Sequence, residues 1–280
     1  MMAFLLCSLI SFVANAGTIH ILSAESLQKN YSHYRAVDAR EGGREELPGA
    51  VRMNWKDWAL ENPSLWNYFF GDSSRWGKIA EDSVGERLTK LGISNATPIA
   101  VVGTPNAWGE EGRIAWNLLF WGAEDVSLVD GGYPAWAALP QQNVSPRPAD
   151  RVPFSLKIEK WRRASMEDVM TNTHTLLDAR STEEFHGKTM SGQKRGGHIP
   201  GANSVPLEAL YEKDGHYLSS ERLRALLPRE MKEPISYCTG GVRSGLLALL
   251  MESKLGLRVA NYDGSIWEWA SHKELSLIIE

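Results

Sequence analysis

The chain carries the same order of short sequence signatures twice. Val37-Asp38-Ala39-Arg40 occurs early and Leu177-Asp178-Ala179-Arg180 occurs later, so the two Asp-Ala-Arg triplets begin 140 residues apart, at 38 and 178. An Asp-Gly pair occurs at Asp130 and again at Asp263, an offset of 133 residues. Two copies of one unit, with small insertions between them, explain both offsets. The repeat therefore predicts two similar domains, which is also the number expected for 280 residues.

Each copy alternates strand-like and helix-like segments. Buried parallel strands are predicted at Thr175 to Asp178, Ile235 to Cys238 and Arg258 to Tyr262. Helices are predicted at Glu221 to Leu227 and Gly245 to Leu255, with Ser244 as the cap of the second. The pattern predicts an α/β fold in which each domain is a mainly parallel sheet flanked by helices. Reactive loops in such folds lie at the carboxyl ends of strands.

One loop of this kind carries a cysteine. The segment from Ile235 to Ser244 reads as a strand, a tight glycine-containing loop and the start of a helix, with Cys238 at the end of the strand. Amide groups and the helix dipole at such a point stabilise a thiolate, so the thiol loses its proton easily. The alternative is a buried structural cysteine. Gly240-Gly241 and Arg243, within five residues of Cys238, favour a nucleophile.

The number of residues between the cysteine and the arginine helps to distinguish between classes of cysteine enzyme. Cysteine phosphatases place five residues between these two, whereas four residues separate Cys238 from Arg243. The loop resembles that of the rhodanese family of sulfurtransferases, as do Gly197 to Ala202 and Tyr262 to Trp269. The resemblance implies that Cys238 carries a sulfane sulfur as a persulfide whose charge is held by loop amides. The loop residues that it assigns to substrate binding are Thr239, Gly240, Gly241, Val242 and Arg243.

The two copies differ at the position of the cysteine. Val102 or Gly103 occupies that place in the first copy, and neither can act as a nucleophile. The chain is similar to tandem rhodaneses of the thiosulfate and 3-mercaptopyruvate sulfurtransferase type. This similarity implies that the first copy is non-catalytic and helps to wall the substrate cleft.

Other polar residues are weaker candidates. Arg195 matches an arginine that contacts substrate in tandem rhodaneses, although it could instead be a solvated charge beside Lys194. Asp178 and Arg180 are expected to form a structural ion pair, and His198 is expected to be a turn residue. No cluster has metal-ligand spacing, so we expect neither a metal nor another cofactor.

The first residues resemble an export signal. Ala3 to Val13 is apolar and too short to span a bilayer, and Ala14-Asn15-Ala16 fits the small-x-small cleavage pattern. A buried N-terminal helix or strand is the alternative. Cleavage would remove Cys7 and leave a mature chain that starts at Gly17, exported to the bacterial periplasm. The expected organisation is a signal peptide over 1–16, a non-catalytic domain over 17–140, a linker over 141–155 and a catalytic domain over 156–280.

These observations predict a ping-pong sulfurtransferase. A small anionic donor, thiosulfate or 3-mercaptopyruvate, would load Cys238, and cyanide or a thiol would accept the sulfur. A persulfide carrier that docks a protein acceptor stays open, as does a small-oxyanion phosphatase or arsenate reductase, which the short loop disfavours. The net charge of −4 gives no sign of nucleic-acid binding. We expect a monomer without stable membrane insertion.

Overall fold

The computed structural model describes residues 17–42, 47–61, 73–140 and 142–279. The predicted signal peptide and Cys7 lie outside these ranges. Within them, no helix has the length and apolar character needed to cross a membrane.

The first half of the chain forms a five-stranded parallel sheet in the order β1-β5-β4-β2-β3. Its strands are β1 (Thr18–Ser23), β2 (Arg35–Asp38), β3 (Val51–Arg52), β4 (Ile99–Val102) and β5 (Asp125–Asp130). Its helices are α1 (Ala24–Lys29), α3 (Val84–Lys90), α4 (Glu110–Trp121) and α5 (Gly132–Ala138). Every residue of β4 is buried, which is typical of a parallel strand covered on both faces.

The second half forms a four-stranded parallel sheet in the order β7-β6-β8-β9. Its strands are β6 (Leu176–Asp178), β7 (Asn203–Ser204), β8 (Ile235–Tyr237) and β9 (Ala260–Asn261). Its helices are α6 (Met166–Met170), α7 (Thr182–Phe185), α8 (Ser220–Ala225), α9 (Arg243–Leu255) and α10 (Ser265–Trp269). The two sheets confirm the predicted fold class, two units that are each a parallel sheet flanked by helices.

The start of α9 differs from the prediction. The helix begins at Arg243, and Val242 at its N-cap position makes no capping hydrogen bond through its side chain. Ser244 lies inside the first turn, where its hydroxyl donates to Oδ1 of Asn261 at 2.7 Å. The prediction that Ser244 caps this helix was therefore wrong, because the helix begins two residues earlier than predicted.

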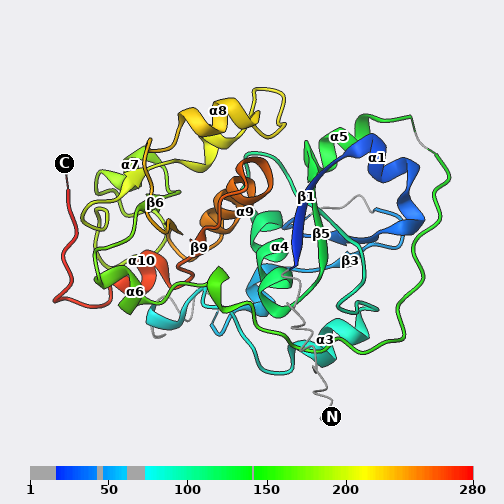
Figure 1. The fold of residues 1–280 in the computed structure, drawn as a ribbon, viewed down its shortest axis with the longest axis horizontal. Helices are drawn as coiled ribbons and strands as arrows, with labels where there is room; N and C mark the ends of the chain where they lie inside the picture. The colour runs from blue at the N-terminus through cyan, green and yellow to red at the C-terminus, as the bar shows by residue number, and fades with distance from the viewer. Residues whose placement is uncertain (1–16, 43–46, 62–72, 141, 280) are drawn as a thin grey trace, which may run out of the picture.

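Helices α4 and α9 lie side by side at the centre of the molecule and join its two halves (Figure 1). All twelve residues of α4 are buried, as expected for a helix surrounded by core on every side. Gly112 allows the contact, because a Cβ there would lie 2.3 Å from Cβ of Leu246. One hydrophobic core runs through both halves and includes Trp116, Leu246 and Leu249.

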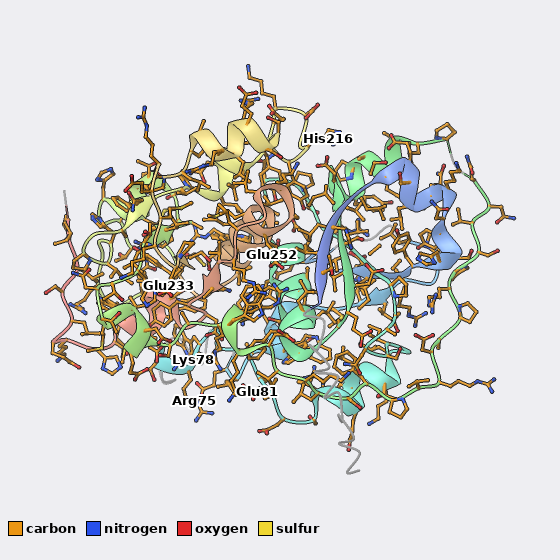
Figure 2. The ribbon with its side chains drawn as sticks, viewed as in Figure 1. Arg75, Lys78, Glu81, His216, Glu233 and Glu252 are labelled. Atoms are coloured by element: carbon orange, nitrogen blue, oxygen red, sulfur yellow. The ribbon has the colours of Figure 1, made fainter. Side chains whose placement is uncertain are left out.

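Polar contacts also join the halves far from this helix pair. Lys78 forms an ion pair with Glu268 of α10, and the His216 imidazole lies 3.3 Å from the carboxylate of Asp130 (Figure 2). The two contacts lie at opposite ends of the boundary in that view. The halves are therefore held together along the length of their interface.

The connection between the halves is extended. Residues 142–159 contain no helix or strand and follow the outside of the first half, the green trace on the right of Figure 1. Asp150 holds this segment, since its carboxylate accepts a hydrogen bond from Ser94 at 3.0 Å and its amide donates to the Gly92 carbonyl. The domain boundaries given above remain predictions.

Candidate active site

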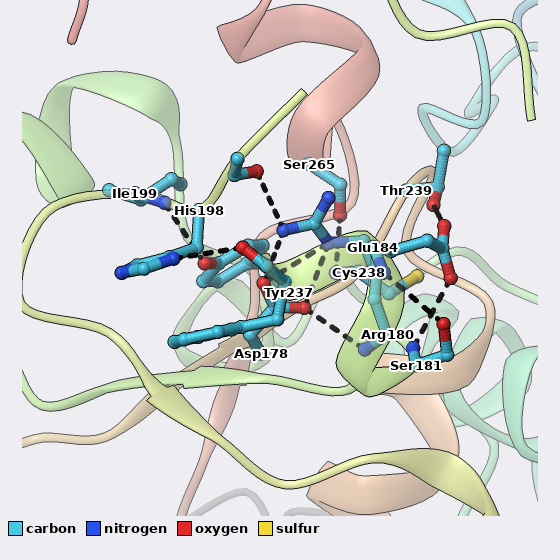
Figure 3. A network of polar contacts seen from close by, with 12 residues as sticks. Asp178, Arg180, Ser181, Glu184, His198, Ile199, Tyr237, Cys238, Thr239 and Ser265 are labelled. Carbon is cyan, nitrogen blue, oxygen red and sulfur yellow. Dashed lines mark hydrogen bonds and ion pairs between the residues drawn. The ribbon is translucent and has the colours of Figure 1, made fainter. Parts of the chain in front are cut away.

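The loop from Cys238 to Val242 connects the end of β8 to the start of α9. Gly241 has a φ of +75°, a backbone conformation that glycine adopts without steric cost. At Gly240, a Cβ would lie 2.1 Å from the ring of Trp267, so this indole packs directly on the loop backbone. Gly241 is therefore favoured by its backbone conformation, and Gly240 by its close contact with Trp267. The amide of Cys238 donates to Oγ of Ser265 at 3.1 Å, which ties the loop to α10 (Figure 3).

The thiol of Cys238 is buried, with 1% of the residue exposed. Burial alone raises the pKa of this thiol because it penalises the thiolate. The charge of Arg243 and hydrogen bonds from Ser244 and Gly240 oppose this effect, and the pKa of Cys238 lies below its ordinary value. The site therefore favours the form of the sulfur that is nucleophilic.

Arg243, the first residue of α9, forms a bidentate ion pair with Glu184 of α7. The two distances are 2.6 Å from Nη1 to Oε2 and 3.0 Å from Nη2 to Oε1. Thr239 completes the cluster, since its hydroxyl accepts from Nη2 of Arg243 at 2.7 Å and donates to Oε1 of Glu184 at 3.0 Å. Figure 3 shows Glu184 and Thr239 beside Cys238. Much of the charge of Arg243 is therefore compensated by a carboxylate.

The sequence analysis missed Glu184. Its local pattern is that of a capping box, and the structure contains this box, in which Ser181 and Glu184 each accept a hydrogen bond from the other's backbone amide. Burial raises the pKa of Glu184, but the hydrogen bond and charge of Arg243 outweigh burial and lower it. The capping signal could have been found, but nothing local indicates that the carboxylate faces the cysteine loop.

A second missed residue comes from the first half of the chain. Arg113 of α4 is fully buried, and its guanidinium donates to the carbonyls of Gly241, at 3.1 Å, and of Gly77. No carboxylate lies within ion-pair distance of Arg113 among the residues that the structure describes. Burial lowers the pKa of Arg113 to about 10, while the charges of Asp263 and Cys238 act in the opposite direction. A positive charge without a paired carboxylate thus lies beneath the cysteine loop.

A cavity of about 160 Å³ opens at Cys238 and is walled by both halves of the chain. The first half contributes Glu41, Trp55, Lys56 and Trp108, and the second contributes Ser191, Cys238, Thr239, Gly240, Val242, Arg243 and Trp267. Of the predicted loop residues, only Gly241 is absent from this lining, because it faces Arg113 and Asp263 instead. The structure thus brings the cysteine, the loop and the arginine to one cavity.

Arg195 lies elsewhere. Its guanidinium donates to the backbone carbonyls of Trp269, Ala270, His272 and Leu275, and it is not part of the cavity lining. The prediction that Arg195 binds substrate is corrected accordingly, because its donors are used to hold the C-terminal segment.

Of two other sequence-based expectations, the ion pair agrees with the structure and the role of His198 does not. Asp178 and Arg180 form a fully buried ion pair, in which Nε of Arg180 lies 2.9 Å from Oδ1 of Asp178. His198 was expected to be a turn residue, but it forms an isolated antiparallel bridge with Ile278. It is buried, stacks on Phe185 and contacts the Phe185 carbonyl through Nδ1 at 3.0 Å. The ion pair and His198 therefore stabilise the structure around the cysteine loop.

The first copy has a glycine at the position of the cysteine. Strand register pairs Asp38 with Val102 and Asp178 with Tyr237, so Gly103 corresponds to Cys238. A Cβ at Gly103 would lie 2.2 Å from Oε2 of Glu111, so a carboxylate fills the space of the missing side chain.

Comparison with known proteins agrees with this architecture. A family model described as the rhodanese-like domain matches residues 161–272. A protein of Mycobacterium bovis with the provisional name thiosulfate sulfurtransferase 1 is 30% identical over 250 residues, which cover 81% of this chain and 84% of that protein. The sulfur carrier protein TtuD of Thermus thermophilus is 29% identical over 247 residues, 80% of this chain and 82% of that protein.

The fold has a solved counterpart as well. The crystal structure of SseA from Escherichia coli, described as a 3-mercaptopyruvate sulfurtransferase with the rhodanese fold, aligns with a TM-score of 0.68. The aligned part is 22% identical and covers 89% of this chain and 99% of that one. The chain belongs to the rhodanese family, in its tandem-domain form. Its relatives indicate a transferase that moves sulfur.

Proposed function

We propose that this protein transfers a sulfane sulfur through a persulfide on Cys238. The observation that carries the proposal is the thiol itself: buried at a cavity, at the start of a helix, with a pKa lowered by Arg243 and by loop hydrogen bonds. A thiolate in such a site is a strong nucleophile whose protonation is controlled by its surroundings. Thiosulfate or 3-mercaptopyruvate is the proposed donor.

The proposed reaction consists of two displacements at sulfur. The Cys238 thiolate attacks the outer sulfur of thiosulfate, the sulfur–sulfur bond of the donor breaks, and sulfite leaves with the electron pair. The amides of Gly240 and Ser244, which already donate to the thiolate, would then stabilise the charge of the persulfide. Cyanide or a thiol attacks the outer sulfur of the persulfide, and Cys238 leaves as the thiolate. The donor product departs before the acceptor reacts, which makes the kinetics ping-pong.

Arg243 and Arg113 would assist in different ways. Arg243 lines the cavity but shares its charge with Glu184, so we propose that it acts mainly by orienting Thr239 and favouring the thiolate. Arg113 holds the Gly241 carbonyl from below, which keeps the loop amides turned toward the sulfur. Thr239, Gly240 and Val242 would contact the substrate directly, because they line the cavity.

Intact-protein mass spectrometry tests this function. Incubation with thiosulfate or 3-mercaptopyruvate alone should add one sulfur atom, and cyanide should remove it with formation of thiocyanate. Cys238→Ser should neither gain sulfur nor turn over, because a hydroxyl cannot form a persulfide, whereas Cys7→Ser should behave as the unmodified chain. Sulfur uptake by Cys238→Ser would refute the assignment. Comparing kcat/KM for the two donors, with cyanide as acceptor, identifies the preferred one.

A second candidate is a persulfide carrier that delivers sulfur to a protein. The relative named sulfur carrier protein, at 29% identity, favours keeping this possibility. A carrier would accept sulfur on Cys238 but release thiocyanate slowly from small donors. Rapid multiple turnover with cyanide would argue against it.

We also propose that the chain is exported to the periplasm after cleavage at Ala14-Asn15-Ala16. Protein isolated from its natural host should then begin at Gly17, which intact mass determines. A cytoplasmic protein that retains residue 1 or 2 would contradict this proposal.

A further inference from the structure

The walls of the cavity indicate what kind of acceptor it takes. Three indoles line it, those of Trp55, Trp108 and Trp267, and Val242 adds an apolar side chain from the loop. Trp267 is fixed, since its Nε1 donates to the Ser191 carbonyl at 2.7 Å and its ring contacts Trp76 edge-on. Trp108 stands at the other side with 51% of its surface exposed.

The charges of the cavity are largely compensated. Lys56 forms an ion pair with Glu41 at 2.5 Å, and its ammonium lies 5.9 Å from the ring centre of Trp55. Arg243 pairs with Glu184 and lies 5.2 Å from the ring centre of Trp108. Each cation that lines the described part of the cavity is therefore matched by a carboxylate and placed near an indole. Such a wall offers little net attraction to a bare anion, and it offers considerable apolar surface.

The size of the cavity limits the ligand further. A volume of about 160 Å³ is close to the engineered apolar cavity of about 150 Å³ that holds a benzene molecule. A body of one ring, or an alkyl chain of similar volume, would fill the space between the indoles while its sulfur meets Cys238. Covering the exposed face of Trp108 would add to the binding free energy.

We propose that the sulfur acceptor is a compact thiol with an apolar or aromatic body, an inference that rests on the persulfide function proposed above. The acceptor thiol passes its proton to the outer sulfur of the Cys238 persulfide anion and attacks that sulfur as the thiolate. The sulfur–sulfur bond to Cys238 breaks, its electron pair stays on Cys238 as the thiolate, and the acceptor leaves as a persulfide that carries the proton. No external oxidant or reductant is needed, because one sulfur–sulfur bond replaces another.

The test is a single-turnover measurement on the full chain. The protein is first loaded on Cys238 with a small donor and freed of excess donor, and loading is checked by mass. It is then mixed with phenylmethanethiol or with 2-mercaptoethanol, each at matched concentrations of its thiolate. Burial of one ring predicts a second-order rate constant about ten- to a hundredfold larger for the aromatic thiol.

Two variants locate the effect. Trp108→Ala should reduce the ratio of the two rate constants by about tenfold, since it removes one wall of the cavity. Trp161→Ala is the matched control, because this indole lies outside the cavity against Arg162 and Arg258 and should leave the ratio unchanged. Because Trp108 is half-exposed, its removal should not unfold the protein.

The outcomes separate this inference from the function on which it rests. Equal rate constants for the two thiols on fully loaded protein would overturn the inference alone, as would a ratio that falls equally in both variants. A protein that never gains sulfur on Cys238 would overturn the proposed function and this inference with it.

Discussion

At the residue scale, the chemistry of Cys238 depends on a balance between charges that the sequence does not place together. Arg243 favours the thiolate, whereas the carboxylate of Glu184, bound to the same guanidinium, reduces that effect. Thr239 links the two and keeps them in register. The sulfur is therefore tuned by a cluster of residues that includes a carboxylate.

Changing Glu184 to glutamine should shift this balance. The glutamine keeps one acceptor oxygen for Arg243 and Thr239 but loses the second acceptor and the negative charge, so the pKa of Cys238 should fall further. The rate of iodoacetamide alkylation, measured against pH in a Cys7→Ser background, should therefore show its midpoint at lower pH. Glu183→Gln, at an exposed neighbouring position, is the control and should not move the midpoint. A shift to higher pH would mean that Glu184 acts mainly by positioning Arg243.

At the element scale, much of the architecture follows from local patterns. The predicted segment Ile235 to Cys238 corresponds to β8 at Ile235–Tyr237, and the helix expected at Gly245 to Leu255 corresponds to α9 at Arg243–Leu255. Pro234 precedes β8, and α9 contains the apolar run from Leu246 to Met251 and ends before Gly256, which are strong local signals.

The parts that sequence reasoning missed are contacts between distant elements. Glu184 lies 59 residues from Arg243, and Arg113 lies 128 residues from the Gly241 carbonyl that it binds. Arg195 was assigned to substrate by resemblance, but the carbonyls that it holds are 74 to 80 residues away. The periodicity of one element carries no information about such distant partners. The cysteine loop could therefore be predicted from the sequence, whereas its contacts with Glu184 and Arg113 could not.

Helix α4 should influence the thiol through Arg113. Arg113→Met removes a buried charge and two carbonyl contacts, so alkylation of Cys238 should require higher pH. The value of kcat/KM should fall about ten- to a hundredfold, the effect of losing a charged hydrogen bond of about 1.5–3 kcal/mol. Arg113→Lys, which retains the charge, should keep the alkylation profile closer to the original.

Arg162→Met provides the control for losing a buried arginine. Arg162 is 1% exposed and pairs with Glu252 at 2.5 Å, away from the cavity. Its substitution should lower the melting temperature without moving the alkylation profile. If a folded Arg113→Met protein kept the original profile, the charge of Arg113 would have no effect on the sulfur.

The loop after β4 should resist conversion into a second reactive site. Gly103→Cys would place its side chain against the carboxylate of Glu111, which should destabilise the protein by about 1–3 kcal/mol. Burial raises the pKa of Glu111 to about 7, so above that pH its negative charge would oppose a thiolate as well. The double variant with Cys238→Ser should therefore gain no sulfur from thiosulfate, as judged by intact mass. Sulfur uptake by this variant, absent from Cys238→Ser alone, would show that the first copy is readily reactivated.

At the scale of the whole molecule, a buried carboxylate lies where the halves meet. Oε1 of Glu111, on α4, accepts hydrogen bonds from the hydroxyls of Tyr211 and Tyr217, at 2.9 and 3.3 Å, while Oε2 has no hydrogen-bond partner among the described residues. Burial raises the pKa of Glu111 to about 7 and raises the pKa of both tyrosines well above their ordinary value. The buried interface is therefore more stable when the Glu111 carboxyl group is protonated.

This proton predicts how stability changes with pH. Between the ordinary glutamate pKa of about 4.3 and the folded value of about 7, the folded state binds more protons than the unfolded state. The free energy of unfolding should thus decrease as pH rises through this range, by about 4 kcal/mol in total, and then level off. Melting temperatures measured from pH 4.5 to 8.5 should show a smaller decline in Glu111→Gln than in the original chain. Glu221→Gln, at an exposed position, should leave the decline unchanged.

The close crossing at Gly112 has a consequence for how this duplicated chain can change by mutation. A copy with Gly103 in place of the cysteine would ordinarily be free to diverge, but here its helix α4 packs against the core of the other copy and holds the cysteine loop through Arg113. Any side chain larger than hydrogen at Gly112 would clash with Leu246, and we expect the strain to disturb the contact of the adjacent Arg113 with the Gly241 carbonyl. Substitutions in the first copy should therefore lower the reactivity of Cys238, so the sequences of the two copies should constrain each other.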